Sequence, residues 1–468
     1  MVRVLVTGAT GYVGSRLVPR LLAQGRSVRC LTRSADRLRN MPWAGRVEVA
    51  EGDLTRPETL PAALDGVEAA YYLVHSLGRP GFEGLDRTCA ENFALAARAA
   101  GIERIVHLGG PAPTPGASPH LRSRGEVADR LLAGGVPTVV LRAGIILGSG
   151  SASFEMLRYL TERLPVMVTP RWVRNRVQPI AARDVLYYLV GVLSAPAGLN
   201  RAFDIGGPDL LTFGELIQRY AAAADLPPRV ILPVRPLTPE LSALWVGLVT
   251  PVPAAIARPL VAGLISEAVT REHEIADVVP DPSGGLLRTD AAIRLAISHP
   301  RGAPVAKPPL VPATPEDPLP SDPPWSGGTV YTCQQEQAVA AGADRLWHAI
   351  QVVAAGRSRT IGCWQPEHVV PGQAIRMRAR MRMPGTAWLD LRVEPETRTR
   401  STYRQVVTFL PHGFAGIVGW TLTRPWHGAI FGGLVRAVVR HARYGVAEVG
   451  QAPPGQMAAP HPATPAGG

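Results

Sequence analysis

The chain of 468 residues has almost no lysine and little cysteine. Among its 49 basic residues there is a single lysine, Lys307, which lies within a proline-rich stretch. Mechanisms that need a catalytic lysine in a folded site are therefore all but excluded. The four cysteines, Cys30, Cys89, Cys333 and Cys363, form neither a CxxC pair nor a zinc-binding spacing with histidine. We therefore expect no metal site and a reducing, cytoplasmic compartment.

Two further absences concern targeting and nucleic acid. The N-terminal residues lack the charged and apolar segments of a secretion signal, in keeping with a cytoplasmic location. The net charge of +12 would suit a nucleic acid or an anionic membrane, but the arginines are scattered and form no basic block or DNA-reading motif. We expect no nucleic-acid partner and attribute the charge to a bias towards arginine.

One long apolar run extends from Leu241 to Ile265. Its length would suit a membrane span. Three prolines and Arg258 interrupt it, however, and the backbone groups freed by the prolines would have no hydrogen-bond partner in a bilayer. We predict helices that line an apolar pocket, and peripheral membrane contact stays open as an alternative.

The N-terminal segment carries the most informative motif. An apolar run from Val2 to Thr7 leads into three glycines spaced three residues apart, and an amphipathic helical pattern follows. Gly8 allows a tight turn, Gly11 lets the backbone approach an anion, and Gly14 lets the helix pack on the strand. The order predicts a dinucleotide pyrophosphate at the helix N-terminus, against an ordinary turn without a ligand. We assign to this site Gly8, Thr10, Gly11, Tyr12, Val13 and Gly14.

The residues after the second and third expected strands bear on the cofactor. NAD-selective sites usually place an acidic residue about 20 residues after the glycines, whereas this chain has Arg33 and Ser34. Because a guanidinium pairs with a 2′-phosphate and a hydroxyl donates to it, we predict NADP(H), with NAD(H) or a merely solvated arginine as alternatives. Asp53 either accepts from the adenine amino group or caps the next helix. Leu54 and Val74 are assigned to the same pocket.

The rest of the chain divides by composition. Residues 1–150 alternate apolar strands with helical patterns, which predicts a doubly wound parallel α/β sheet. Residues 151–300, with a short strand near Phe203, indicate a helical substrate lobe, and the proline-rich residues 301–327 indicate a stiff linker. We expect a second domain over residues 328–448 and a disordered tail over residues 449–468. The strands of the first sheet are expected at residues 2–7, 27–32, 46–50, 68–74, 103–108 and 137–142, with helices at 82–100 and 121–133.

The expected second domain contains a strictly alternating segment. From Ile375 to Met383, apolar residues alternate with arginine, which predicts a strand with one buried face. The arginine row favours a solvated face over a ligand site. Residues 387–393 and 402–409 are expected to be further antiparallel strands, and an amphipathic helix is expected from Trp426 to Ala442.

Together these features resemble the short-chain dehydrogenase/reductase superfamily, in its extended or atypical branch with a TGxxGxxG fingerprint. Further motifs resemble a bacterial NAD(P)H-binding subfamily that carries a C-terminal domain of unknown function, DUF2867. These motifs are Tyr71–Ser76, Asn92–Phe93, Leu108–Gly110, His120–Arg124, Leu141–Gly144, Gln178–Ile180, Asp184, Phe203–Gly207, Pro384–Leu389, Gln405–Pro411 and Pro425–Phe431. The resemblance implies a second domain with an α+β helix-grip, START-like fold around an apolar ligand. This chain departs from the pattern between Ile350 and Pro371, where it is shorter.

The same resemblance locates a departure in the catalytic residues. Active members of the superfamily use a tyrosine and a lysine four residues later, and the corresponding positions here are His120 and Arg124. His120 could transfer a proton near neutral pH or cap a helix. Arg124 could hold the nicotinamide ribose but cannot exchange protons. His75, just after the fourth strand, is the second candidate for proton transfer, whereas Asp184 favours a structural role.

The sequence thus predicts an oxidoreductase that passes hydride between NADP(H) and a small apolar carbonyl, enone or quinone-like substrate. Two alternatives stay open. One is a catalytically inactive NAD(P)H-sensing regulator, which the missing tyrosine and lysine favour. The other is a lipid- or quinone-binding protein at the membrane surface, which the apolar run and the C-terminal helix favour. A homo-oligomer is compatible with either interpretation.

Overall fold

The computed structural model describes residues 3–233, 246–247, 249–298, 317–355 and 362–444. The chain divides into two compact units, Met1–Thr329 and Val330–Gly468. No helix within the described residues is long and apolar enough to cross a membrane. Lys307 and the predicted tail over residues 449–468 lie outside the described residues.

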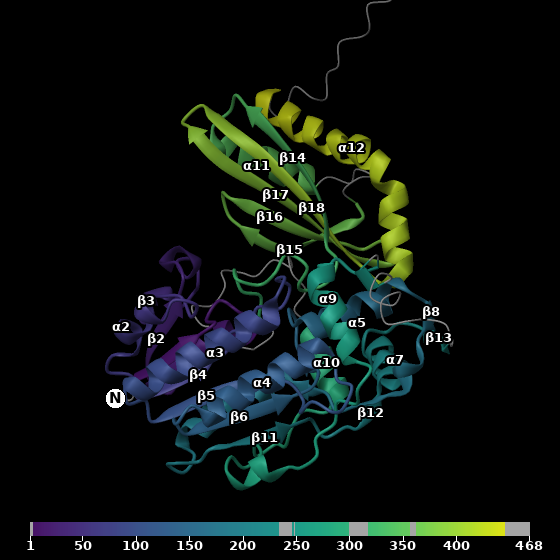
Figure 1. The fold of residues 1–468 in the computed structure, drawn as a ribbon. Helices are drawn as coiled ribbons and strands as arrows, with labels where there is room; N and C mark the ends of the chain where they lie inside the picture. Colours follow the sequence, from purple (N-terminus) through teal and green to yellow (C-terminus); the bar gives the residue numbers. More distant parts are fainter. Residues whose placement is uncertain (1–2, 234–245, 248, 299–316, 356–361, 445–468) are drawn as a thin grey trace, which may run out of the picture. The chain divides into compact units, whose positions relative to one another are not determined.

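Seven parallel strands form the sheet of the first unit, in the order β11-β6-β5-β4-β1-β2-β3 (Figure 1). The chain builds outwards from β1 to β3, returns to β4 beside β1, and builds outwards on the other side. This order confirms the predicted doubly wound α/β fold. The strand near Phe203, expected in the lobe, instead joins this sheet as β11. The strands are β1 (Arg3–Thr7), β2 (Ser27–Thr32), β3 (Glu48–Glu51), β4 (Ala69–Tyr72), β5 (Arg104–Gly109), β6 (Thr138–Ala143) and β11 (Arg201–Ile205).

Helices cover both faces of this sheet. On β1, the side chains of Val4 and Val6 point to one face and Leu5 points to the other, as expected for a strand buried on both sides. Helices α1 and α6 contribute to the core on the first face, and α2, α3 and α4 to the core on the second. Their bounds are α1 (Tyr12–Ala23), α2 (Leu60–Leu64), α3 (Phe82–Ala99), α4 (Pro119–Ala133) and α6 (Ala182–Gly191).

The lobe consists of short strands and helices that follow β6. Residues 254–263 of the apolar run form helix α9, which packs Ala257 and Val261 against Met156 and Leu160 of α5. This part of the run is therefore a helix on the core of the lobe. The elements are β7 (Ile146–Leu147), α5 (Ala152–Arg163), β8 (Val166–Thr169), β9 (Arg176–Val177), β10 (Ile180–Ala181), β12 (Leu211–Thr212), α7 (Phe213–Ala223), β13 (Val230–Pro233), α9 (Ala254–Gly263) and α10 (Thr289–Ile297).

The described end of the proline-rich stretch, residues 317–327, is hydrogen-bonded to the helices of the first unit. Asp322 forms two hydrogen bonds of 2.8 and 3.0 Å with the guanidinium of Arg16 in α1, and both side chains are buried. The amide of Gly327 donates to the carboxylate of Glu155 in α5 at 3.0 Å. The prediction of a stiff linker is therefore wrong for residues 317–327. Composition suggested a linker, but the residues that hold this segment are distant in the chain.

In its described residues, the second unit is an antiparallel sheet with two helices, in the strand order β14-β18-β17-β16-β15 (Figure 1). This arrangement confirms the predicted α+β class of the C-terminal domain. Its core includes the fully buried side chains of Met377, Leu389, Leu391, Tyr403 and Val438. The elements are β14 (Tyr331–Val339), α11 (Ala343–Ala355), β15 (Trp364–Val370), β16 (Ala374–Ala379), β17 (Gly385–Thr397), β18 (Arg400–Pro411) and α12 (Gly413–Tyr444).

Two of the elements expected in the second unit differ in length. Strand β16 ends at Ala379, so only the first part of the alternating segment pairs with its neighbours. Within it, Ile375 and Met377 face the core, and Arg376 lies 2.6 Å from Asp390 on β17. Helix α12 begins well before the expected start and continues through Pro425. The helix bends along its length (Figure 1), and the proline inside it removes one backbone hydrogen bond.

Candidate functional site

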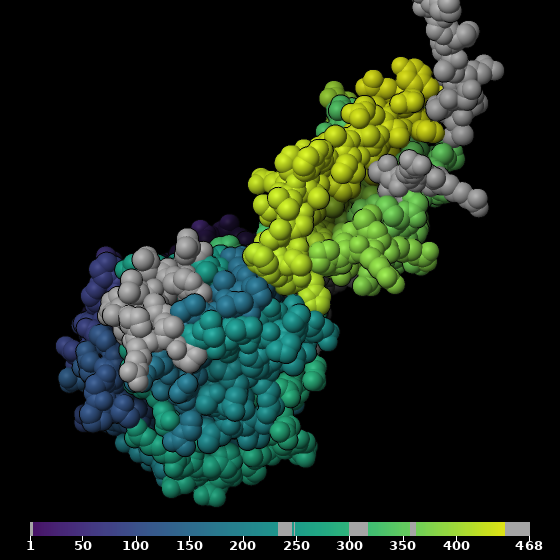
Figure 2. All heavy atoms as spheres, turned by 90° about the vertical axis from the view of Figure 1, so that its right-hand side faces the viewer, coloured from purple at the N-terminus to yellow at the C-terminus, as the bar shows by residue number. Residues whose placement is uncertain are grey.

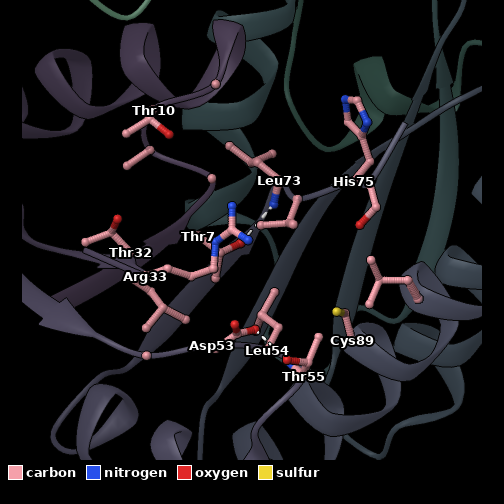
Figure 3. A pocket seen from close by; sticks show the side chains of 18 of the residues that line it. Thr7, Thr10, Thr32, Arg33, Asp53, Leu54, Thr55, Leu73, His75 and Cys89 are labelled. Atoms are coloured by element: carbon pink, nitrogen blue, oxygen red, sulfur yellow. Dashed lines mark hydrogen bonds between the residues drawn. The ribbon is translucent and has the colours of Figure 1, made fainter. Parts of the chain in front are cut away.

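A pocket of about 390 Å³ lies at the carboxyl ends of β1, β2, β3 and β4 (Figure 3). This is the point at which the strand order reverses, where doubly wound sheets bind ligands. The hydroxyl of Thr7 ties two of the strands together, since it donates to the carbonyl of Tyr71 and accepts from the amide of Leu73. The lining comes from four loops and from α3, at Thr7–Gly11, Leu31–Arg33, Arg37, Gly52–Thr55, Leu73–Leu77, Arg79, Leu85 and Cys89.

The glycine loop leaves no room for a Cβ atom at Gly8 or at Gly14. Gly8 has a φ of +69°, and a Cβ atom there would lie 2.7 Å from the carbonyl oxygen of Leu73. A Cβ on Gly14 would lie 2.3 Å from the carbonyl oxygen of Gly8. The amide of Gly11 closes the turn on that same carbonyl at 2.9 Å. The backbone therefore approaches the pocket closely just where α1 begins, which suits an anion at a helix N-terminus.

The residues predicted for the glycine loop lie partly in the pocket lining and partly in helix α1. Gly8, Thr10 and Gly11 line the pocket. Tyr12 and Val13 belong to the first turn of α1 and do not contribute to that lining. The ring of Tyr12 packs instead under the guanidinium of Arg16, 4.3 Å from its centre. Tyr12, Val13 and Gly14 thus shape the start of the helix.

At the other end of the pocket, two arginines follow β2. Arg33 lines the pocket as predicted, and Arg37 joins it from the short 3-10 turn Ala35–Arg37. Sequence reasoning missed Arg37, although its spacing of four residues from Arg33 was a signal. Ser34 is not among the lining residues; its backbone carbonyl accepts from the hydroxyl of Thr32 at 3.0 Å. The predicted contact of Ser34 with a 2′-phosphate is not supported by this position.

Asp53 lies in the same pocket with its neighbour Leu54. Its carboxylate accepts from the amide of Thr55 at 2.9 Å and from the Thr55 hydroxyl at 2.8 Å. Partial burial alone would raise the pKa of Asp53, but these hydrogen bonds and the Arg33 cation lower it overall. The side chain is therefore an ionised acceptor. Val74 lines the pocket from the segment after β4.

Two of the three candidates for catalysis, His75 and His120, interact electrostatically with the third, the partly buried Arg124. His75 lines the pocket, whereas His120 and Arg124 belong to α4 and lie outside its lining. The guanidinium of Arg124 donates to the carbonyl of Leu108 at 2.7 Å. Asp86, which sequence reasoning missed, accepts from the amide of Ser76 at 2.7 Å, and its charge interacts with that of Arg124.

The two candidate histidines are neutral at pH 7. Burial and the Arg124 cation lower the pKa of His120 to about 4. The pKa of His75 is also lowered, by the surrounding protein and by Arg124, although the ring is exposed at the pocket. Nδ1 of His75 accepts from the amide of Leu77 at 3.3 Å, so the neutral ring carries its proton on Nε2. A neutral imidazole is a hydrogen-bond donor but a weak acid.

The comparisons with known proteins agree with this geometry. Residues 8–126 match the family described as NAD(P)H-binding. A ceramide reductase of Caulobacter vibrioides is 30% identical over 232 residues, which are 49% of this chain and 72% of that protein. The chain belongs to the atypical, NAD(P)H-binding branch of the short-chain dehydrogenase/reductases. Residues 332–434 match a second family, described as a protein of unknown function, DUF2867.

Two more similarities concern the first unit of this short-chain dehydrogenase/reductase. An NAD(P)H azoreductase of Xenophilus azovorans is 28% identical over 231 residues, which are 49% of this chain and 76% of that protein. The crystal structure of a nucleoside-diphosphate-sugar epimerase from Staphylococcus aureus superimposes with a TM-score of 0.52 at 17% identity. It covers 62% of this chain and 99% of its own length, and it shows the fold alone. The predicted family and the nicotinamide cofactor class are thus confirmed, and the chain is an NAD(P)H-binding reductase of the atypical type.

Proposed function

We propose that this reductase uses NADP(H) and passes hydride to an apolar, conjugated acceptor such as an enone or a quinone-like compound. The observation that carries the cofactor preference is the pair Arg33 and Arg37 in the pocket after β2. Two guanidinium groups there suit a doubly charged 2′-phosphate and leave the 2′-hydroxyl of NAD(H) without an acidic partner. Asp53 would accept from the adenine amino group, and the glycine loop would hold the pyrophosphate.

The acceptor class follows from the proton chemistry of the site. When bound, the cofactor would supply a hydride, which carries two electrons. A simple ketone would then become an alkoxide, which needs a general acid to protonate it. The histidines are neutral donors, and Arg124 does not exchange protons. A conjugated acceptor spreads the new charge, so that a hydrogen bond from Nε2 of His75 and a proton from water would suffice. The names of the two relatives, an azoreductase and a ceramide reductase, likewise describe reductases.

Arg33→Ala should weaken the binding of NADPH far more than that of NADH. Loss of a charge-assisted contact to the 2′-phosphate should lower NADPH affinity by about 10- to 100-fold, while NADH affinity should change less than about threefold. Fluorescence titration of both cofactors measures this. Arg46→Ala is the control, because Arg46 is exposed in the same unit and does not line the pocket. An equal loss for both cofactors would contradict the assignment.

NADPH oxidation should show no inflection where an ordinary histidine titrates. Because the pKa of His120 is lowered from 6.5 to about 4, its ring gains a proton only as the pH falls towards 4. We expect kcat/KM with quinone and enone acceptors to be constant above about pH 5.5.

His75→Ala should lower kcat by about 100-fold, if the Nε2 donor of His75 stabilises the reduced anion. Tight cofactor binding without turnover on any acceptor would instead support the sensing regulator.

A further inference from the structure

Helix α12 of the second unit carries an apolar strip that the described residues leave uncovered. In Figure 2 the atoms of α12, in yellow, face the viewer along the helix. Leu422 and Trp426 are 66% and 62% exposed, and Phe414 and Ile430 are about half exposed. The opposite side of the helix is buried at Gly416, His427, Leu434, Val438 and Ala442. The apolar strip consists of Phe414, Val418, Leu422, Trp426 and Ile430, spaced four residues apart.

This spacing places the strip along one side of α12. Residues four apart lie on one side of a helix, and at about 1.5 Å per residue the strip is about 24 Å long. Soluble proteins rarely leave a contiguous apolar surface of this size uncovered unless it has a partner. An exposed tryptophan within the strip, with an apolar ring and a polar N–H, is typical of surfaces at a membrane interface.

The charge of α12 also suits a membrane surface. Between Gly413 and Tyr444 there is no acidic residue. Arg436, Arg440 and Arg443 are exposed and lie about four, five and six turns after Leu422, so they continue the face of the apolar strip. The second unit as a whole, Val330–Gly468, has 15 arginines against 7 acidic residues, a net charge of +8 out of the +12 of the chain.

We propose that α12 docks the second unit on the surface of a bilayer that contains anionic lipids. The helix lies in the plane of the membrane, with the apolar strip among the upper acyl chains and the three arginines at the lipid phosphates. A bilayer surface offers apolar and anionic groups side by side, which is the complement of this face. The docking goes beyond the reductase function and requires no cofactor.

Flotation of the full chain with vesicles, in the absence of nicotinamide cofactor, tests this proposal. The chain should bind vesicles of phosphatidylcholine with about 30% phosphatidylglycerol at least tenfold more tightly than vesicles of phosphatidylcholine alone. Leu422→Ser with Trp426→Ser should reduce this binding at least tenfold. Leu95→Ser should leave it unchanged, since Leu95 on α3 of the first unit has the same exposure, 66%.

The arginines give a separate readout. Arg436→Gln and Arg440→Gln should each weaken binding about fivefold, on anionic vesicles only, and added salt should remove the difference. Circular dichroism and the Tm check that each variant is folded. Absence of binding to anionic vesicles, or equal binding by the strip variants, overturns the proposal. A strip variant that converts a dimer into a monomer, without vesicle binding by the parent, overturns it in favour of a second copy of this chain.

Discussion

Asp322→Ala is expected to destabilise the first unit by about 3–5 kcal/mol. The substitution removes the carboxylate of a buried ion pair with Arg16, since both side chains are at most 5% exposed. The backbone carbonyls of Tyr12, Ser149 and Asp317 also accept from Arg16. The loss is larger than the net contribution of the ion pair, because a buried cation loses a charged partner that offset the cost of its desolvation.

Urea unfolding of the full chain, followed by circular dichroism, measures this loss in the transition of the first unit. Asp36→Ala is the control, because Asp36 pairs with Arg39 on the exposed surface and should cost less than about 1 kcal/mol. The double substitution of Arg16 by Met and Asp322 by Leu should recover most of the stability, since apolar side chains of similar size remove both charges. A loss below about 1 kcal/mol for Asp322→Ala would contradict the role of the pair.

Gly14→Ala is expected to lower the affinity for NADPH and for NADH alike by more than about 100-fold. The new Cβ atom would lie 2.3 Å from the carbonyl oxygen of Gly8 and 3.0 Å from the Cα atom of Ala9. All these neighbours are backbone atoms, so the loop itself must move away from its binding geometry. The equal effect on both cofactors distinguishes this substitution from Arg33→Ala.

Fluorescence titration against both cofactors measures the loss, and circular dichroism verifies the fold. Gly84→Ala serves as the control, because a Cβ on Gly84 in α3 meets no atom within 4 Å. Alanine is also the better helix former at such a position. Unchanged cofactor binding by Gly14→Ala would show that the loop does not hold the pyrophosphate.

Local patterns predicted much of the fold and of the cofactor pocket. The strands that alternate with helices and the glycine loop depend on residues close in sequence, and the pocket contains Arg33 and Asp53 as expected. The pattern could not show that the strand near Phe203 would join the main sheet, because pairing with β6 is a long-range choice. It also began α12 too late, at Trp426 instead of Gly413, because the helix continues through Pro425.

The electrostatic surroundings of the candidate catalytic residues could not be predicted from the sequence, because they too depend on long-range contacts. The neutral state of His120 depends on burial and on Arg124, and Asp86 reaches this cluster from a different helix. The composition of residues 317–327 indicated a linker, because proline content is a local property whereas the partners of Asp322 and Gly327 come from α1 and α5.

The pair between Arg16 and Asp322 also bears on how the chain folds as it is made. The two residues are 306 positions apart, so at about 5–20 residues per second the ribosome delivers Asp322 about 15–60 s after Arg16. Throughout that interval α1, the helix behind the glycine loop, lacks its contact with the Asp322 carboxylate. This helix is translated among the first elements and reaches its final packing among the last. The final packing of α1 is therefore reached only after almost the whole first unit has been synthesised.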